Sequence, residues 1–208
     1  MIDIVNCEQG TEDWFRARMG LPTASEFHAI LAKGEGKTRK SYMLRLAGEI
    51  VTGEPSETYS NGHMERGKAL EPEARELYAF MTDAEPQQVG FIRNFGAGCS
   101  PDSLLGTAGM LEIKTKLPAL LIECILRGDL HFPPEHKAQC QGALWVAERE
   151  WIDLAVYWPK MPLFVSRAYR DAAYIDELAG AVEKFSAELA DTVERVRKYG
   201  AVPVERAA

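Results

Sequence analysis

Ser100-Pro101-Asp102 and, after an interval of nine residues, Glu112-Ile113-Lys114 form the stretch of sequence that decides this fold. Side chains of a β-strand point alternately to its two faces, so a strand here places Glu112 and Lys114 on one face and turns Ile113 into the core. The glycine-bounded segment 106–109 lies between two apolar pairs and predicts a turn that folds the Asp102 segment back beside this strand. The predicted hairpin brings two carboxylates and an ammonium group to one place.

Two carboxylates beside a lysine are typical of a site that binds a divalent cation and uses the amine to handle a proton or to stabilise charge. The same residues have a simpler interpretation. In it, Asp102 is a turn residue after Pro101, and Glu112 and Lys114 are a solvent-facing pair on an edge strand. Short motifs of this kind have many chance matches, so the rest of the chain has to decide between the two.

The composition is that of a soluble globular protein. The chain has 208 residues, 46% hydrophobic and 26% charged, and we expect a single domain over residues 1–208. No stretch approaches the ~18 consecutive apolar residues of a membrane span, and the N-terminus lacks the features of a signal peptide, so we expect a cytoplasmic protein without membrane contact. The dispersed Cys7, Cys99, Cys124 and Cys140 indicate reduced thiols. A net charge of −7 excludes a wholly basic surface that coats nucleic acid, but not a local basic groove.

Periodicity and turn residues predict an alternation of helices and strands. Thr23 and Glu26 have the spacing of a capping box, the basic segment 33–40 is typical of a loop, and Pro72 falls inside a helical pattern. The predicted order is helices at 8–20, 23–31, 42–50 and 64–81, strands at 89–95, 99–105 and 110–116, helices at 118–127 and 134–148, strands at 151–158 and 163–169, and a closing helix at about 172–198. This order indicates an α/β fold with a mixed central β-sheet covered by helices on both faces.

Several blocks of the chain together resemble one nuclease family. The Ser-Pro-Asp tripeptide, the nine-residue interval and the Glu-Ile-Lys tripeptide resemble the PD-(D/E)xK nuclease motif. Three further blocks are similar, in the same order, to the lambda exonuclease-like and YqaJ viral recombinase branch of alkaline exonucleases. They are Trp14 with Arg18-Met19-Gly20 and Thr23-Ala24-Ser25-Glu26, then 66–71, then 138–141 with Leu144-Trp145-Val146. The resemblance covers about residues 8–158. It implies a restriction-endonuclease-like core.

The resemblance implies which residues hold metal. Asp102 and Glu112 match the metal-binding carboxylates, with the main-chain carbonyl of Ile113 as a further ligand. Glu71 matches a catalytic helix glutamate that helps to hold a second metal or its water. Oxygen ligands of this kind suit Mg²⁺, with Mn²⁺ as an alternative, and two ions in one site would clamp both the attacking and the leaving oxygen.

The resemblance also implies roles for five other residues. Lys114 matches the lysine that positions or deprotonates the attacking water, and Gln139 the glutamine that lines the catalytic site. Arg18, Ser25 and Ser100 match a pocket for a 5′-terminal phosphate, which a guanidinium and hydroxyl donors would suit. The simpler alternative is that the arginine makes a local salt bridge, Ser25 caps a helix and Ser100 belongs to a turn.

The implied function is that of a metal-dependent 5′→3′ exonuclease that digests one strand of linear double-stranded DNA and leaves 3′ single-stranded tails for phage-type homologous recombination. The implied partners are 5′-phosphorylated DNA ends, a single-strand annealing protein and further copies of the chain in a ring-shaped trimer, within a bacterial host of a phage or prophage. Two alternatives stay open: a structure-selective endonuclease or resolvase on the same fold, and a non-catalytic DNA-binding phage module. Retention of Asp102, Glu112 and Lys114 argues against the second.

Overall fold

A β-hairpin forms where the sequence predicts it. The structure is a computed structural model that describes residues 1–32, 37–56 and 62–201. In it β5 (Ser103–Leu105) and β6 (Gly109–Thr115) pair antiparallel, with Ser103 opposite Leu111. Gly106, in the connecting turn, has a φ of +55°, which glycine adopts without the clash that a side chain would meet. The two segments of the motif therefore lie side by side.

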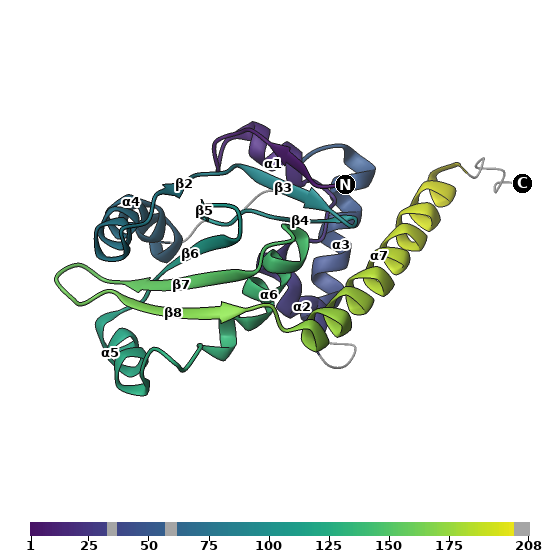
Figure 1. Cartoon of the computed structure of the whole chain (residues 1–208). Helices are drawn as coiled ribbons and strands as arrows, with labels where there is room; N and C mark the ends of the chain where they lie inside the picture. Colours follow the sequence, from purple (N-terminus) through teal and green to yellow (C-terminus); the bar gives the residue numbers. More distant parts are fainter. Residues whose placement is uncertain (33–36, 57–61, 202–208) are drawn as a thin grey trace, which may run out of the picture.

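A five-stranded mixed sheet extends from this hairpin (Figure 1). β7 (Trp151–Tyr157) runs parallel to β6, β8 (Phe164–Tyr169) runs antiparallel to β7, and the short β2 (Pro86–Gln87) pairs with β5. The strand order is β2-β5-β6-β7-β8. A parallel neighbour needs a long crossover connection, and the two helices between β6 and β7 supply it.

The predicted strand 99–105 is wrong as a single element. β1 (Asp3–Val5), β3 (Phe91–Asn94) and β4 (Ala97–Cys99) form a separate three-stranded sheet, and β4 ends before β5 begins. Ser100-Pro101-Asp102 crosses from the small sheet to the large one. Proline has no N–H for a strand ladder, which is the physical reason for the break. The motif thus starts where the chain leaves one sheet for the other.

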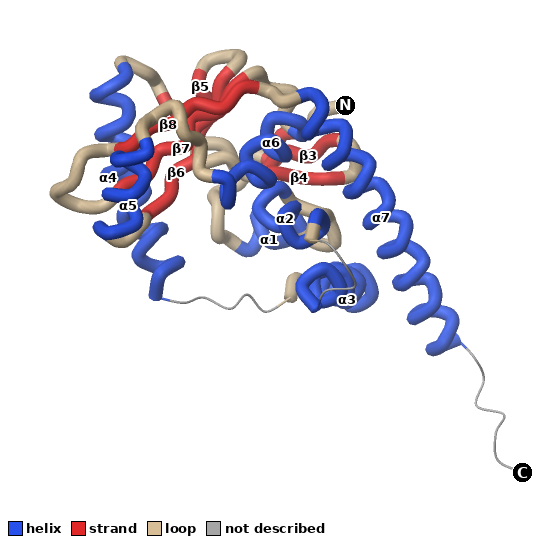
Figure 2. The backbone as a smooth tube through the Cα atoms, turned by 90° about the horizontal axis from the view of Figure 1, so that it is seen from below, coloured by secondary structure: helices blue, strands red, loops and turns tan. Residues whose placement is uncertain are grey.

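Seven α-helices and two short 3₁₀ turns complete the described part of the chain, as Figure 2 shows in blue. They are α1 (Glu12–Arg18), a 3₁₀ turn (Ala24–Glu26), α2 (Phe27–Leu31), α3 (Lys37–Thr52), α4 (Gly62–Thr82), α5 (Pro118–Arg127), a 3₁₀ turn (Pro134–His136), α6 (Lys137–Val146) and α7 (Ala172–Ala201). α4 is continuous through Pro72. None of the helices in the described ranges is both long and apolar enough to cross a bilayer.

Helices cover both faces of the large sheet, which confirms the predicted α/β class. On one face, α4 packs Ala74 and Tyr78 against Leu111 and Ile113 of β6. On the other, α5 packs its apolar side against Leu154 and its neighbours on β7 and β8. The period of two along β6 therefore sends Ile113 toward α4 and Glu112 toward the opposite face.

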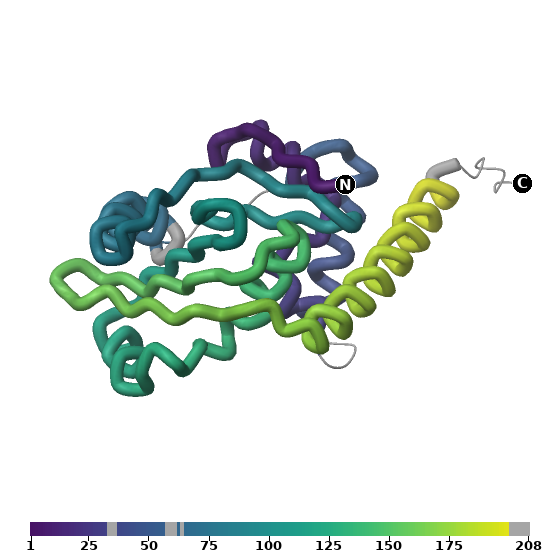
Figure 3. Tube along the Cα trace, in the orientation of Figure 1, coloured from purple at the N-terminus to yellow at the C-terminus, as the bar shows by residue number. Residues whose placement is uncertain are grey.

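A third apolar cluster joins the small sheet to α2, α3, α6 and α7. α7 contributes a stripe at helical spacing that includes Leu178, Phe185 and Val193. Figure 3 shows α7 on the side of the molecule away from α4 and α5. The same cluster includes Met110 of β6, so long-range packing reaches the strand that carries the motif.

Two smaller predictions near the N-terminus are wrong. The predicted capping box does not form, because the side chain of Thr23 caps no helix N–H. Its hydroxyl accepts a hydrogen bond from Arg18 at 3.2 Å, and Glu26 pairs with Arg45 at 2.9 Å. A competing ionic partner for the glutamate removes the capping box. The predicted loop 33–40 is helical from Lys37 onward as the start of α3, and its residues 33–36 lie outside the described residues.

Candidate active site

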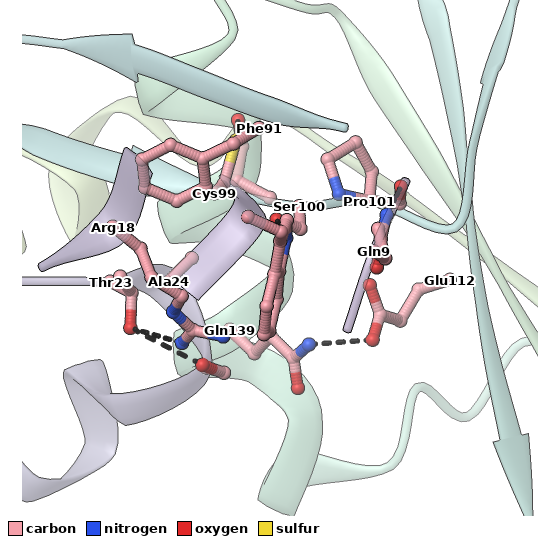
Figure 4. Close-up of a pocket in the computed structure, with 13 residues that line it drawn as sticks. Gln9, Arg18, Thr23, Ala24, Phe91, Cys99, Ser100, Pro101, Glu112 and Gln139 are labelled. Carbon is pink, nitrogen blue, oxygen red and sulfur yellow. Dashed lines mark hydrogen bonds between the residues drawn. The ribbon is translucent and has the colours of Figure 1, made fainter. Parts of the chain in front are cut away.

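Glu112, Lys114 and Gln139 meet through one oxygen atom. Glu112 is buried on β6, with its side chain 4% exposed, and its Oε1 accepts hydrogen bonds from Lys114 Nζ at 2.7 Å and from Gln139 Nε2 at 2.5 Å. Gln139 comes from α6, so helix and strand are joined at this carboxylate, as Figure 4 shows for the Gln139 contact. The burial rules out the solvent-facing pair that the motif alone left open.

Asp102 lies beside the same strand. Its Oδ2 accepts a hydrogen bond from the N–H of Ile113 at 2.5 Å, which fixes the carboxylate next to Glu112 and Lys114. Burial, and then the charges of Glu112 and Glu71, raise the pKa of Asp102 well above its usual range. Burial lowers the pKa of Lys114, but Glu112 and Asp102 outweigh this and raise it overall, so the ammonium stays charged.

Glu71 is the third carboxylate and comes from α4, on the other side of the sheet. Its Oε1 accepts a hydrogen bond from Arg75, one helical turn further along. The same Arg75 nitrogen lies 3.5 Å from the main-chain oxygen of Asp102, so Glu71 and Asp102 share a neighbour although they are distant in sequence, and the charge of Glu71 raises the pKa of Asp102. All five residues predicted for the catalytic site, Asp102, Glu112, Lys114, Glu71 and Gln139, are thus connected directly or through one neighbour.

The donor chemistry of this site fits a hard divalent cation. Asp102, Glu112 and Glu71 supply carboxylate oxygens. A bound cation would relieve the repulsion between the carboxylate of Asp102 and those of the other two. Within the residues that the structure describes, however, no three acidic, histidine or cysteine side chains stand together as a ready-made ion cage. The ligand roles of Asp102, Glu112, Glu71 and the Ile113 carbonyl therefore stay predictions.

The residues predicted for the phosphate pocket lie together, in a cavity of about 170 Å³. Arg18 donates to the Thr23 hydroxyl at 3.2 Å, and that hydroxyl lies 3.4 Å from the Ser25 hydroxyl. Ser100 accepts a hydrogen bond from Trp14 Nε1 at 2.8 Å. Glu112 and Gln139 line the same cavity. One cavity therefore connects the residues predicted to bind phosphate with two of the residues predicted for catalysis (Figure 4).

Arg18 has the surroundings of an anion-binding group. Its guanidinium carbon lies 4.1 Å from the centre of the Trp14 ring, and burial lowers its pKa. In the described part of the chain it forms no ion pair, which argues against the local salt bridge. Ser25 lies inside the 3₁₀ turn, where its hydroxyl faces Thr23 and makes no capping bond to any described residue.

Three residues that sequence reasoning left out of the site are part of it. Trp14 holds both Arg18 and Ser100, and Gln9 Nε2 donates to the main-chain oxygen of Pro101 at 3.1 Å. Arg75 contacts Glu71, and its i+4 spacing from that glutamate was a visible signal. For Gln9 no sequence signal exists, because its partner lies 92 residues away.

A comparison with models of protein families gives a match over most of the chain. The family model of the YqaJ-like viral recombinase domain matches residues 13–150. The chain belongs to this family. The matched segment of the YqaJ-like domain runs from α1 to the loop before β7 and so includes every predicted site residue. No curated protein sequence matched the chain.

Solved structures share the fold of this YqaJ-like domain. The alkaline exonuclease LHK-Exo from Laribacter hongkongensis is 34% identical, with a TM-score of 0.83 over 92% of this chain and 98% of that one. A second LHK-Exo structure, in complex with dAMP, gives 35% identity and a TM-score of 0.84 over the same shares. A phage-related exonuclease from Haemophilus somnus 129PT is 15% identical, with a TM-score of 0.60 over 83% of this chain and 96% of that one, and shows the fold alone. Family and neighbours together support a nuclease role.

Proposed function

We propose that the chain is a 5′→3′ exonuclease that digests one strand of linear double-stranded DNA and leaves 3′ single-stranded tails for phage-type recombination. One observation carries the proposal: a single cavity joins Arg18, Ser25 and Ser100 to Glu112 and Gln139. A phosphate held at one end of a small cavity and hydrolysis at the other suit an enzyme that cuts from a 5′-phosphorylated end. The alkaline exonucleases that share the fold support the same assignment.

The chain's own residues would divide the work of hydrolysis. Lys114 keeps its positive charge beside Glu112 and Asp102, so it can orient a water molecule and stabilise the negative charge that develops on the phosphate. Gln139 and Lys114 hold one oxygen of Glu112 in place. Asp102, Glu112, Glu71 and the Ile113 carbonyl would hold Mg²⁺, with Mn²⁺ as an alternative and two ions in one site. When bound, such ions supply Lewis acidity toward the phosphate oxygens.

The remaining parts of the proposal concern partners and place. Digestion of DNA ends for recombination calls for a single-strand annealing protein that takes up the 3′ tail. We further propose a ring-shaped trimer that encloses the duplex, in the cytoplasm of a bacterial host. The net charge of −7 suits a ring whose positive charge is confined to the surface that faces DNA.

Strand-resolved digestion tests the proposal. A linear duplex labelled at either end of one strand, with a 5′-phosphate on that strand, should lose nucleotides from its 5′ end only when Mg²⁺ or Mn²⁺ is present. A covalently closed circle of the same sequence is the matched substrate and should stay intact. Degradation of the circle would replace the exonuclease with the endonuclease alternative, and binding without any cleavage would favour the non-catalytic module.

A further inference from the structure

Arg75 contacts both segments that bring carboxylates to the site from opposite directions. Its Nη2 donates to Glu71 on its own helix, and its Nε donates to the hydroxyl of Ser103 at the start of β5, at 3.0 Å. The same Nη2 lies 3.5 Å from the main-chain oxygen of Asp102. The side chain of Arg75 is 14% exposed. Arg75 therefore lies in the interface between α4 and β5 and does not form an ordinary ion pair on the surface.

The planar guanidinium makes this double contact possible. Its N–H groups point in fixed directions, so one side chain can grip a carboxylate and a strand at once without a search over rotamers. Ser103 is fully buried and links the two residues. Its hydroxyl accepts the hydrogen bond from Arg75 and donates one to the Asp102 main-chain oxygen at 2.6 Å. The main chain at Asp102 is thus braced by Arg75 directly and through Ser103.

The orientation of Glu71 follows from the same contact. Its Oε1 is bonded to Arg75, which leaves Oε2 as the oxygen free of this bond and available to a cation. A carboxylate held by one oxygen presents the second in a defined direction. Without this bond, Glu71, with its side chain 30% exposed, would be free to turn toward solvent.

We infer that Arg75 is a positioning residue for the metal site: its guanidinium aims Glu71 at the bound cation while it braces the main chain of Asp102. The inference rests on the proposed function, since it needs a cation in the site. It makes Arg75 the group that sets how tightly the cation touched by Glu71 is held. Groups that orient metal ligands in this way typically change metal affinity by about 10- to 100-fold.

If Arg75 acted through its charge alone, the expected effect on cation affinity would be the opposite. A positive charge beside the site repels a cation, so its removal would strengthen cation binding. Arg75→Lys distinguishes the geometric role from the electrostatic one, because lysine keeps the positive charge but lacks the planar, fixed N–H groups of the guanidinium. If geometry decides, Arg75→Lys binds the cation more weakly than the wild type. If charge alone decides, Arg75→Lys equals the wild type and Arg75→Gln binds more tightly.

Tyr78 supplies a matched control on the same face of α4. Its hydroxyl donates to Asp153 of β7 at 2.6 Å, so it ties the helix to the sheet just as Arg75 does, one turn further along. None of the contacts of Tyr78 reaches Glu71 or Asp102 in the described part of the chain. Tyr78→Phe therefore loosens α4 without changing the orientation of the ligands.

The experiment is calorimetric titration of Mn²⁺ into the metal-free full-length protein, with melting temperature measured for each variant. Arg75→Lys is expected to weaken Mn²⁺ binding about tenfold, and Tyr78→Phe is expected to lower the melting temperature and leave Mn²⁺ affinity unchanged. The Mn²⁺ concentration that gives half-maximal digestion should shift in parallel for Arg75→Lys, with the rate recovered at high Mn²⁺.

Three outcomes would overturn the inference. The first is an Arg75→Lys isotherm that superposes on the wild type. The second is an equal loss of Mn²⁺ affinity in Tyr78→Phe, which would reduce Arg75 to a structural tie. In both cases wild-type Mn²⁺ binding and DNA cleavage would still stand. The third is a wild-type protein that neither binds Mn²⁺ nor degrades DNA, which would remove the proposed function together with the inference.

Discussion

The two ends of the cavity are built in opposite ways. The carboxylate end (Glu112, which lines the cavity, with Asp102 and Lys114 beside it) is made by one hairpin, and its hydrogen bonds from Lys114 and from the Ile113 N–H span short sequence distances. The phosphate end (Arg18, Ser25 and Ser100) is assembled from α1, a 3₁₀ turn and the crossing between two sheets, and the bond that joins Trp14 to Ser100 spans 86 residues. Under the proposed function, the first end would set the rate on any substrate, while the second end would select the substrate.

The strongest test of the carboxylate end is Asp102→Asn. The substitution keeps the size of the side chain and an oxygen that can accept from Ile113, but removes the charge. We expect cleavage of every DNA substrate to fall by at least about a thousandfold, because charge stabilisation at the reacting phosphate is lost. Burial and the negative charges of Glu112 and Glu71 disfavour the ionised form of Asp102, so the neutral variant should also be more stable than the wild type in EDTA.

Single-turnover digestion and urea unfolding measure the two effects. Glu177→Gln, which changes an exposed carboxylate on α7, is the control for the lost charge and should leave both quantities unchanged. Wild-type rates in Asp102→Asn would show that the hairpin carboxylate is not part of the chemistry.

Lys114→Ala should have the next largest effect and should act on rate alone. The ammonium bonded to Glu112 at 2.7 Å is available to a water or to the transition state, so its removal should slow cleavage by about a hundredfold or more. DNA affinity, measured by fluorescence anisotropy in Ca²⁺, should change little. A variant that lost DNA binding and kept its turnover would move Lys114 from the carboxylate end to the substrate-binding surface.

The contrast between the two ends also explains how far the sequence could predict them. The period of two and the glycine turn are local features, so the hairpin and the shared face of Glu112 and Lys114 were predictable. Contacts made across the fold were not. The partners of Gln9 and Trp14 are 92 and 86 residues away, and no spacing rule connects them. The break at Pro101 was a readable signal, yet the sheet change that it causes depends on packing of the whole chain.

The N-terminal end of α6 offers a test of stability beside the carboxylate end. His136 Nε2 is buried and has no hydrogen-bond partner among the described residues; Glu135 lies 4.0 Å away. Burial, and then the charges of Lys114 and Lys116, lower the pKa of His136 to about 4. The folded state therefore takes up this proton at lower pH than the unfolded state, whose histidine titrates near 6.5. The free energy of unfolding should fall as pH drops from about 6.5 to about 4.

This loss of stability is at most about 3.5 kcal/mol, and it is complete once the pH lies below the pKa of His136 in the folded protein. His136→Asn should remove it. Urea unfolding of both proteins at pH 7.5 and pH 5 measures the difference, which cancels titrations that the two proteins share. Equal pH dependence in wild type and variant would mean that the imidazole finds a partner when it is charged.

The phosphate end should respond in discrimination and not in rate. Arg18→Lys keeps the charge but loses the planar fork over Trp14. The preference for a 5′-phosphate over a 5′-hydroxyl should fall about tenfold, equivalent to about 1.4 kcal/mol. The maximal rate on a 5′-hydroxyl duplex should be unaffected, because Asp102 and Glu112 are unchanged. Competition between the two substrates in one tube measures the ratio directly.

Trp14→Phe is the matched variant for this experiment, with a smaller expected effect. Phenylalanine keeps an aromatic ring beneath the Arg18 guanidinium but removes the N–H that donates to Ser100 at 2.8 Å. The preference should fall by less than in Arg18→Lys, since one neutral hydrogen bond is lost while the charged group stays in place. An equal fall in both variants would show that Ser100, held by Trp14, contributes as much to phosphate selection as the guanidinium. A fall in rate on both substrates would instead show that the two ends of the cavity act as one unit.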